Sequence, residues 1–236
     1  IDFSGNSDAG LYSFGFSYAV LLMIFSNAVM QAYKPWLYIS YKNNEIKQIR
    51  SSNKIITYVM CILTLIIITV APEALKILGA REFWEAKLVV APIALGALFQ
   101  YIYNTYSSLE LYHKKTTVIA IGSIFAAIIN YSLNSAFIPV YGYSAAAYTT
   151  FISYFILAFF HLIAYRNICN KSIYDDQFTW LIIIITAVIS LIISMLYTNF
   201  LVRYLFLVIL LSIIFYKQNA KILLIFNLIK KKYIKN

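Results

Sequence analysis

Seven long apolar stretches, separated by short polar connections, dominate the hydropathy pattern of the chain. They cover about residues 11–33, 55–72, 88–112, 117–138, 144–165, 179–197 and 201–216. Each is about 17 to 25 residues long, and about 20 helical residues cross a hydrocarbon core of roughly 30 Å. The pattern therefore predicts about seven transmembrane helices.

A β-barrel does not fit these stretches. Only helices and closed barrels satisfy all their backbone groups in lipid, and continuous apolar runs such as 181–196 lack the alternation of a barrel strand. Hydrophobic residues make up 62% of the chain and charged residues 12%, against roughly 45–50% and about 25% in soluble domains. The predicted fold class is an all-α, polytopic integral membrane protein.

The basic residues fall on alternate connections. With alternate loops on opposite sides, 15 of the 19 Lys and Arg residues share one side: Lys34, Lys42, Lys47, Arg50, Lys54, Lys114, Lys115, Arg166, Lys171, Lys217, Lys221, Lys230, Lys231, Lys232 and Lys235. The positive-inside rule makes that side cytoplasmic, which puts the visible N-terminus outside and the C-terminus inside. The net charge of +10 then reflects topology. We expect the tail to attract anionic lipids, at about 1 kcal/mol per residue, and no nucleic acid.

Prolines mark several expected helix ends. We expect the first span to end at Lys34-Pro35, because proline disfavours helix at the preceding residue, and the second to end at Pro72. A basic loop containing Lys42, Lys47, Arg50 and Lys54 would connect them. Pro139 and Gly142 predict a turn between the fourth and fifth spans.

Polar residues inside the spans are the best sequence clue to a substrate pathway, because lipid-facing polar groups cost free energy. Small residues such as Thr186 and Ser190 on the sixth span are read as packing contacts. Larger amides need several hydrogen-bond partners, and both packing and a cavity lining remain open for them. The candidate pathway residues on the first, third and fourth spans are Asn27, Gln31, Lys34, Gln100, Asn104, Glu110, Asn130 and Asn134.

The charged residues among these have ordinary explanations too. Lys34 would snorkel to the membrane surface, and Glu110 would pair with Lys114 four residues later. His161 is expected near the membrane interface, with a proton relay as the alternative reading. Arg203 is expected to snorkel outward.

Signatures of catalysis are missing from the sequence. The two histidines have no zinc-site spacing, and no phosphate-binding loop, nucleophile elbow or dinucleotide fingerprint occurs. Cys61 and Cys169 indicate neither a disulfide framework nor a metal cluster. We therefore expect a protein that is not an enzyme and has no cofactor or metal. Because the chain starts at Ile1 beside acidic residues, we also expect it to be the C-terminal part of a longer protein.

Several short strings resemble a known family. They follow one another in the family's order and cover about residues 9–165: Ala9-Gly-Leu-Tyr-Ser13, Gln31-Ala-Tyr-Lys-Pro-Trp36, Leu78-Gly79 with Phe83-Trp84, His113-Lys-Lys-Thr116, and Asn130 followed by Ile138-Pro-Val-Tyr-Gly-Tyr-Ser-Ala-Ala-Ala147. In these strings the chain resembles the second half of the bacterial polysaccharide flippases, which export O-antigen and capsule units and belong to the multidrug/oligosaccharidyl-lipid/polysaccharide exporter superfamily.

The resemblance implies a fold of two six-helix lobes around a central cavity. Residues 1–165 would supply five helices of the second, MATE-like lobe, and residues 166–236 a terminal helix pair with a basic cytoplasmic tail, while the first lobe would be missing. The implied partner is an undecaprenyl-diphosphate-linked oligosaccharide, moved across the bacterial inner membrane by alternating access and coupled to an ion gradient. Lys34 would contact the diphosphate, and other polysaccharide-assembly membrane proteins would be further partners.

Two alternative functions stay open. One is an O-antigen polymerase or ligase, a membrane enzyme of the same pathway, although the predicted external loops hold only Arg81 and Arg203 for diphosphate chemistry. The other is a drug exporter of the same superfamily.

Overall fold

The computed structural model describes residues 5–209 and residue 212, and this part of the chain is helical without any strand. Six α-helices and one 3₁₀ helix follow one another: α1 (Gly5–Lys42), α2 (Ile46–Leu78), η1 (Arg81–Ala86), α3 (Lys87–Tyr112), α4 (Thr116–Tyr141), α5 (Tyr143–Cys169) and α6 (Asp176–Met195). All six α-helices are long and apolar enough to cross a membrane. The protein is therefore an all-α, multi-pass membrane protein, and the first six predicted spans are confirmed.

The chain divides into two compact units, residues 1–194 and 195–236. In the described part of the second unit, Phe200–Ile209 forms a short apolar helix. The guanidinium of Arg203 lies 5.7 Å and 5.3 Å from the ring centres of Tyr197 and Tyr204. Most of the rest of the seventh predicted span, and the basic tail, lie outside the described residues.

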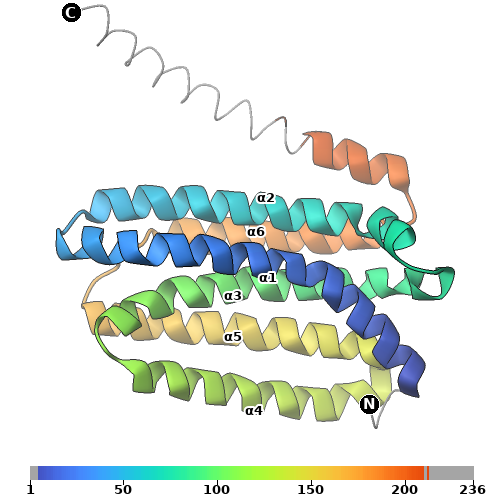
Figure 1. Cartoon of the computed structure of the whole chain (residues 1–236), viewed down its shortest axis with the longest axis horizontal. Helices are drawn as coiled ribbons and strands as arrows, with labels where there is room; N and C mark the ends of the chain where they lie inside the picture. The colour runs from blue at the N-terminus through green and yellow to red at the C-terminus, as the bar shows by residue number, and fades with distance from the viewer. Residues whose placement is uncertain (1–4, 210–211, 213–236) are drawn as a thin grey trace, which may run out of the picture. The chain divides into compact units, whose positions relative to one another are not determined.

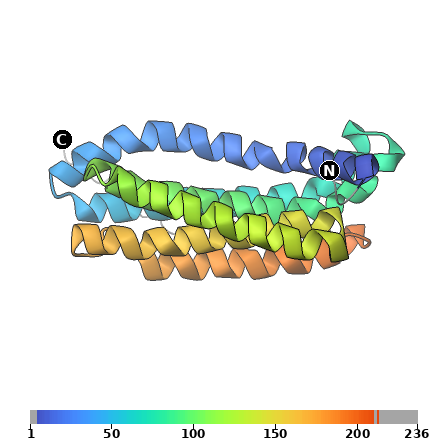
Figure 2. The same ribbon diagram turned by 90° about the horizontal axis from the view of Figure 1, so that it is seen from below.

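Successive helices of the first unit run in opposite directions along one common axis (Figures 1 and 2). The three connections that the sequence assigns to one side accordingly meet at one end of the bundle. Tyr41 of α1 is 3.0 Å from His113 after α3, and Arg50 of α2 donates to the carbonyl of Ser172 after α5. The alternation of the loops is therefore confirmed for α1 to α6.

Three prolines at which the sequence predicts a helix end or a turn lie inside helices. Pro35, Pro72 and Pro139 lie within α1, α2 and α4. Proline removes one backbone hydrogen bond. In a membrane helix, neighbouring helices and small local adjustments of the backbone can satisfy the group that is left without a partner, so the helix continues. Hence α1 and α2 extend to Lys42 and Leu78, and the expected basic loop is only the turn 43–45. Lys47, Arg50 and Lys54 belong to α2.

The core of the unit is α3. In its most apolar window 78% of the residues are buried, against 11% in α4. It packs extensively against α1 and α5, whereas α4 packs mainly on α5 and exposes large apolar residues such as Ile124, Ile128 and Tyr131. Helix α3 is thus the central helix against which the others pack.

The predicted turn between α4 and α5 is confirmed at Gly142. Its φ angle is +69°, a backbone conformation that a residue with a Cβ rarely adopts. The turn reverses the chain within a single residue. As a result α4 and α5 lie side by side (Figures 1 and 2), and their facing polar groups come into contact.

Candidate functional site

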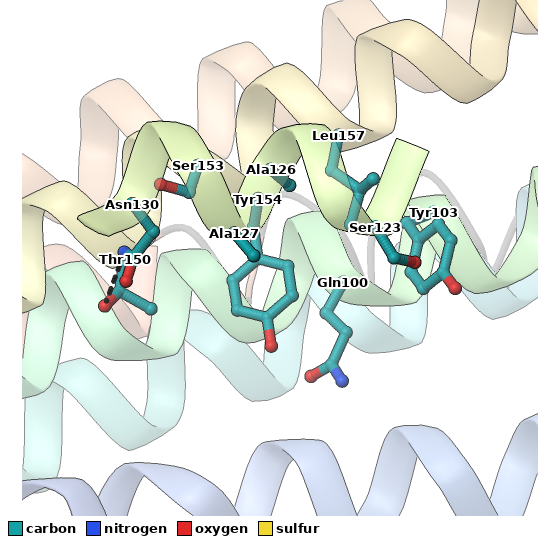
Figure 3. Close-up of a pocket in the computed structure, with 10 residues that line it drawn as sticks. All are labelled: Gln100, Tyr103, Ser123, Ala126, Ala127, Asn130, Thr150, Ser153, Tyr154 and Leu157. Atoms are coloured by element: carbon teal, nitrogen blue, oxygen red, sulfur yellow. Dashed lines mark hydrogen bonds between the residues drawn. The ribbon is translucent and has the colours of Figure 1, made fainter. Parts of the chain in front are cut away.

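A cavity of about 340 Å³ lies between α3, α4 and α5. Seven of the ten residues that line it bear an amide or a hydroxyl group, and the remaining three are small or aliphatic: Gln100, Tyr103, Ser123, Asn130, Thr150, Ser153 and Tyr154, with Ala126, Ala127 and Leu157. Figure 3 shows the side chains of Gln100 and Tyr154 pointing to the same side of the cavity. Because Ser123 and Ala127 are exposed, the cavity is accessible from outside.

The cavity lies deep in the span of the helices. Gln100 is thirteen residues after Lys87, the first residue of the 26-residue α3. At 1.5 Å per residue this places it about 20 Å along the helix. Polar side chains at such a depth are costly unless they find partners or water. The other polar groups of the lining provide partners, and the cavity has room for water.

The amides of α4 are fixed by a short hydrogen-bond network. Asn130 donates from Nδ2 to the hydroxyl of Thr150, 3.5 Å away, and Asn134 donates to Oδ1 of Asn130 over 3.0 Å. Oδ1 of Asn134 in turn accepts from the hydroxyl of Thr149. The dashed line in Figure 3 marks the first of these bonds. The network leaves Asn130 oriented along the cavity wall before any ligand binds.

The structure brings together only some of the predicted pathway residues. Gln100 and Asn130 line the cavity, and Asn134 supports it. Asn104, on the next turn of α3, is half-buried outside the lining, where its carbonyl accepts from the hydroxyl of Ser108.

The residues proposed on α1 form a separate stripe. Asn27 and Gln31 are exposed and Lys34 is half-buried. Their spacing of four and three residues places them on one face of the helix, and α1 contributes no residue to the cavity lining.

Glu110 and His161 form a buried pair, hereafter the Glu110–His161 pair. Nδ1 of His161 lies 2.7 Å and 2.8 Å from the two carboxylate oxygens of Glu110, and both side chains are 0% exposed. The expected pairing of Glu110 with Lys114 is wrong, because Lys114 lies in the exposed turn after α3 with a φ of +58°. His161, expected near the membrane interface, is buried inside the protein, and its depth in the membrane stays a prediction.

The surroundings of His161 are unusually tight. A Cβ built on Gly122 of α4 would lie 2.7 Å from its Nε2 atom and 2.8 Å from the ring of Phe160. Nε2 itself has no hydrogen-bond partner within the described part of the chain. On the cavity side, the ring of Tyr103 lies 4.8 Å from the imidazole between ring centres. One aromatic side chain therefore separates the pair from the cavity.

Sequence reasoning missed a second buried carboxylate, Asp176 at the start of α6. Its Oδ2 accepts from the hydroxyls of Tyr165 and Ser172 and from Nε and Nη2 of Arg166, the last at 2.7 Å. The only available signal was an acidic pair directly before an apolar run, which is typical of a helix N-terminus. Its partners come from the end of α5 and the following loop, so spacing alone does not identify them.

The chemistry of the cavity follows from its lining. None of the ten side chains is ionised at neutral pH, so the cavity suits a neutral molecule rich in hydroxyl or amide groups. Within the described part of the chain, no group of three His, Cys, Asp or Glu residues could hold a metal ion. Comparisons with models of protein families, with curated proteins and with solved structures give no match to this chain.

Proposed function

We propose that this protein moves an undecaprenyl-diphosphate-linked oligosaccharide across the bacterial inner membrane for the assembly of O-antigen, capsule or exopolysaccharide. The observation that supports it is the cavity between α3, α4 and α5. It combines amides, hydroxyls and two tyrosine rings at mid-depth in a bundle of apolar helices.

Sugar chemistry matches this lining. A sugar ring presents several neutral hydroxyls, which amides such as Gln100 and Asn130 bind as both donors and acceptors. It also presents apolar C–H faces, which pack on aromatic rings such as Tyr154. A volume of about 340 Å³ is near the lower end of ligand pockets, roughly 300–1,000 Å³. The cavity would hold one part of the glycan at a time.

The rest of the substrate would stay outside the cavity. A polyprenyl chain is as apolar as lipid and gains nothing from a polar site. The lining has no cation for the diphosphate, so that group would remain near the basic end of the bundle. Lys34 on α1 would contact it there, with the N-terminal end outside the cell and the basic turns in the cytoplasm.

The test is translocation in proteoliposomes. The protein is reconstituted with undecaprenyl-diphosphate linked to a fluorescent oligosaccharide, and the fraction that becomes accessible to a membrane-impermeant quencher is followed over time. Wild-type protein should speed this transfer above that of protein-free vesicles. Gln100→Met, which keeps the volume but removes the amide, should slow it at least fivefold.

A matched control removes an amide elsewhere. Gln177 is exposed at the start of α6, away from the cavity lining, and Gln177→Met should leave the rate unchanged. Equal rates for both variants, or no transfer by the wild type, would contradict the proposal. Longer glycans in the vesicles would instead favour the polymerase-type enzyme, and transfer of drugs but not of the lipid-linked sugar would favour the exporter.

A further inference from the structure

The charge of the Glu110–His161 pair depends on a single proton. With one proton on Nδ1 of His161 and an ionised Glu110, the pair has a net charge of −1. A second proton makes the pair neutral, either as imidazolium with carboxylate or as imidazole with carboxylic acid. Among the described residues no lysine or arginine forms an ion pair with Glu110. A buried net charge is unfavourable, so the packed arrangement seen here favours the doubly protonated pair.

Few other titratable groups face the buried pair. From α3, Tyr103 stacks on the imidazole, and from α5, Cys169 lies within electrostatic range of Glu110. Tyr41 of α1 contacts Cys169, and Lys171 in the loop acts on the same thiol. From α4 the facing residue is Gly122, which has no side chain. None of these groups is a cation in contact with the carboxylate that would replace the proton.

Helix α4 covers the pair, because its Gly122 lies against Nε2 of His161. It packs mainly on α5 and is the least buried of the six. Gly122 comes so close to His161 that a water molecule does not fit between them. A charged pair would need water, and α4 would have to move away to admit it. The same movement would widen the cavity, because Ser123, Ala126 and Asn130 of α4 form one of its walls.

We propose that Glu110 and His161 together form a proton-binding site, and that binding of one proton holds α4 against α5, whereas its release lets α4 move away and widens the polar cavity. The proton comes from and returns to water. The identity of the transported molecule in this inference rests on the proposed function. The link between protonation and cavity opening is independent of what the cavity transports.

The first test uses the fact that the chain has only two histidines, His113 and His161. Full-length protein labelled with ¹⁵N-histidine is studied in nanodiscs by NMR between pH 5 and 9, and His113→Gln identifies the signal of His161. We expect His161 to exchange a proton within this range. Glu110→Gln should lower its proton affinity at least tenfold, because the imidazolium loses its anionic partner. A His161 signal that stays constant, or that titrates identically in Glu110→Gln, would overturn the proposal.

The second test measures cavity opening. Cysteine is introduced at Ala126, a buried residue of the cavity lining, in a background with Cys61→Ala and Cys169→Ala, and its reaction with a water-soluble thiol reagent is measured against pH. Cysteine at Asn43, in the exposed turn after α1, reports the intrinsic pH dependence of the reagent. After this correction the Ala126 position should react at least threefold faster above the midpoint of His161 than below it. The dependence should vanish in Glu110→Gln, and an equal dependence in that variant would contradict the link.

Translocation then separates this inference from the function. If wild-type protein moves the lipid-linked sugar and a pH gradient drives it equally in wild type and Glu110→Gln, the proton-binding site is not coupled to transport and the inference fails alone. If no sugar moves but His161 titrates and the cavity opens with it, the proposed function fails and the proton-binding site remains.

Discussion

Glu110 and Asp176 are both buried carboxylates near the basic end of the bundle, yet their surroundings differ. Asp176 is held by Tyr165, Arg166 and Ser172, including a guanidinium. Among the described residues, the carboxylate of Glu110 has only His161 as a side-chain hydrogen-bond or ion-pair partner. The partner of the first carboxylate is a guanidinium, which is always charged, whereas the partner of the second is an imidazole. Two carboxylates that are equally buried therefore differ in the chemistry of their partners, and only the Glu110–His161 pair fits the proposed proton-binding site.

The largest difference in stability is expected between the variants in which Asp176 or Glu110 is replaced by its amide. Asp176→Asn weakens the bonds from Arg166, and hydrogen bonds to charged groups contribute about 1.5–3 kcal/mol, so we expect a loss of about 2–3 kcal/mol of stability. Glu110→Gln keeps an oxygen that accepts from His161 and should cost less than about 1 kcal/mol by the same accounting. Unfolding in mixed micelles of increasing SDS content measures both. A larger loss for Glu110→Gln would reverse the comparison.

A smaller effect is expected from adding a methyl group beside the Glu110–His161 pair. Gly122→Ala would place a methyl group 2.7 Å from Nε2 of His161, and overpacking of this kind costs about 1–3 kcal/mol, of which helix propensity returns about 1 kcal/mol. Gly96→Ala is the matched control, because its Cβ meets Tyr154 at an ordinary 3.5 Å. The same unfolding assay should show a net loss for Gly122→Ala and none for Gly96→Ala. Equal stabilities of Gly122→Ala and Gly96→Ala would show that α4 shifts to accommodate the methyl group without loss of stability.

The smallest effect concerns Asp175, the partly exposed neighbour of Asp176. Its hydrogen bond to Lys54, at 2.6 Å, lowers the pKa of Asp175 below its ordinary value. The folded state therefore binds this proton less readily than the unfolded chain. The stabilisation is present above the unfolded pKa of about 3.9 and is lost as pH falls through the lower folded value.

Asp175→Asn should accordingly reduce stability at neutral pH by less than about 1 kcal/mol, as for other exposed ion pairs, and should flatten the loss of stability below pH of about 4. The control is Glu82→Gln, the same loss of charge in the exposed η1 helix at the other end of α3. Melting temperatures measured between pH 3 and 7 compare the two variants. If the melting temperature of Asp175→Asn fell at acidic pH as steeply as that of the wild type, the ion pair with Lys54 would not stabilise the fold.

The candidate site was only partly predictable from the chain. Gln100, Asn130 and Asn134 stood out because amides are costly in lipid, and the structure places them in or beside one cavity. Tyr103, Thr150 and Tyr154 could not be singled out, since the chain has 21 tyrosines and nothing in their spacing distinguishes a cavity lining from a membrane anchor. The burial of His161 could not be predicted from its own helix. Its partner lies on α3, fifty-one residues earlier.

By itself the sequence determined the membrane class, the positions of the first six spans and the alternation of the basic turns, because hydrocarbon thickness and the cost of moving charges across it act on each segment separately. Only the tertiary structure decided that α3 is buried while the equally long α4 is exposed, which amides share a cavity, and which buried carboxylate receives a histidine and which an arginine. These outcomes depend on how helices distant in sequence pack against one another, and a local hydropathy pattern contains no information about that packing.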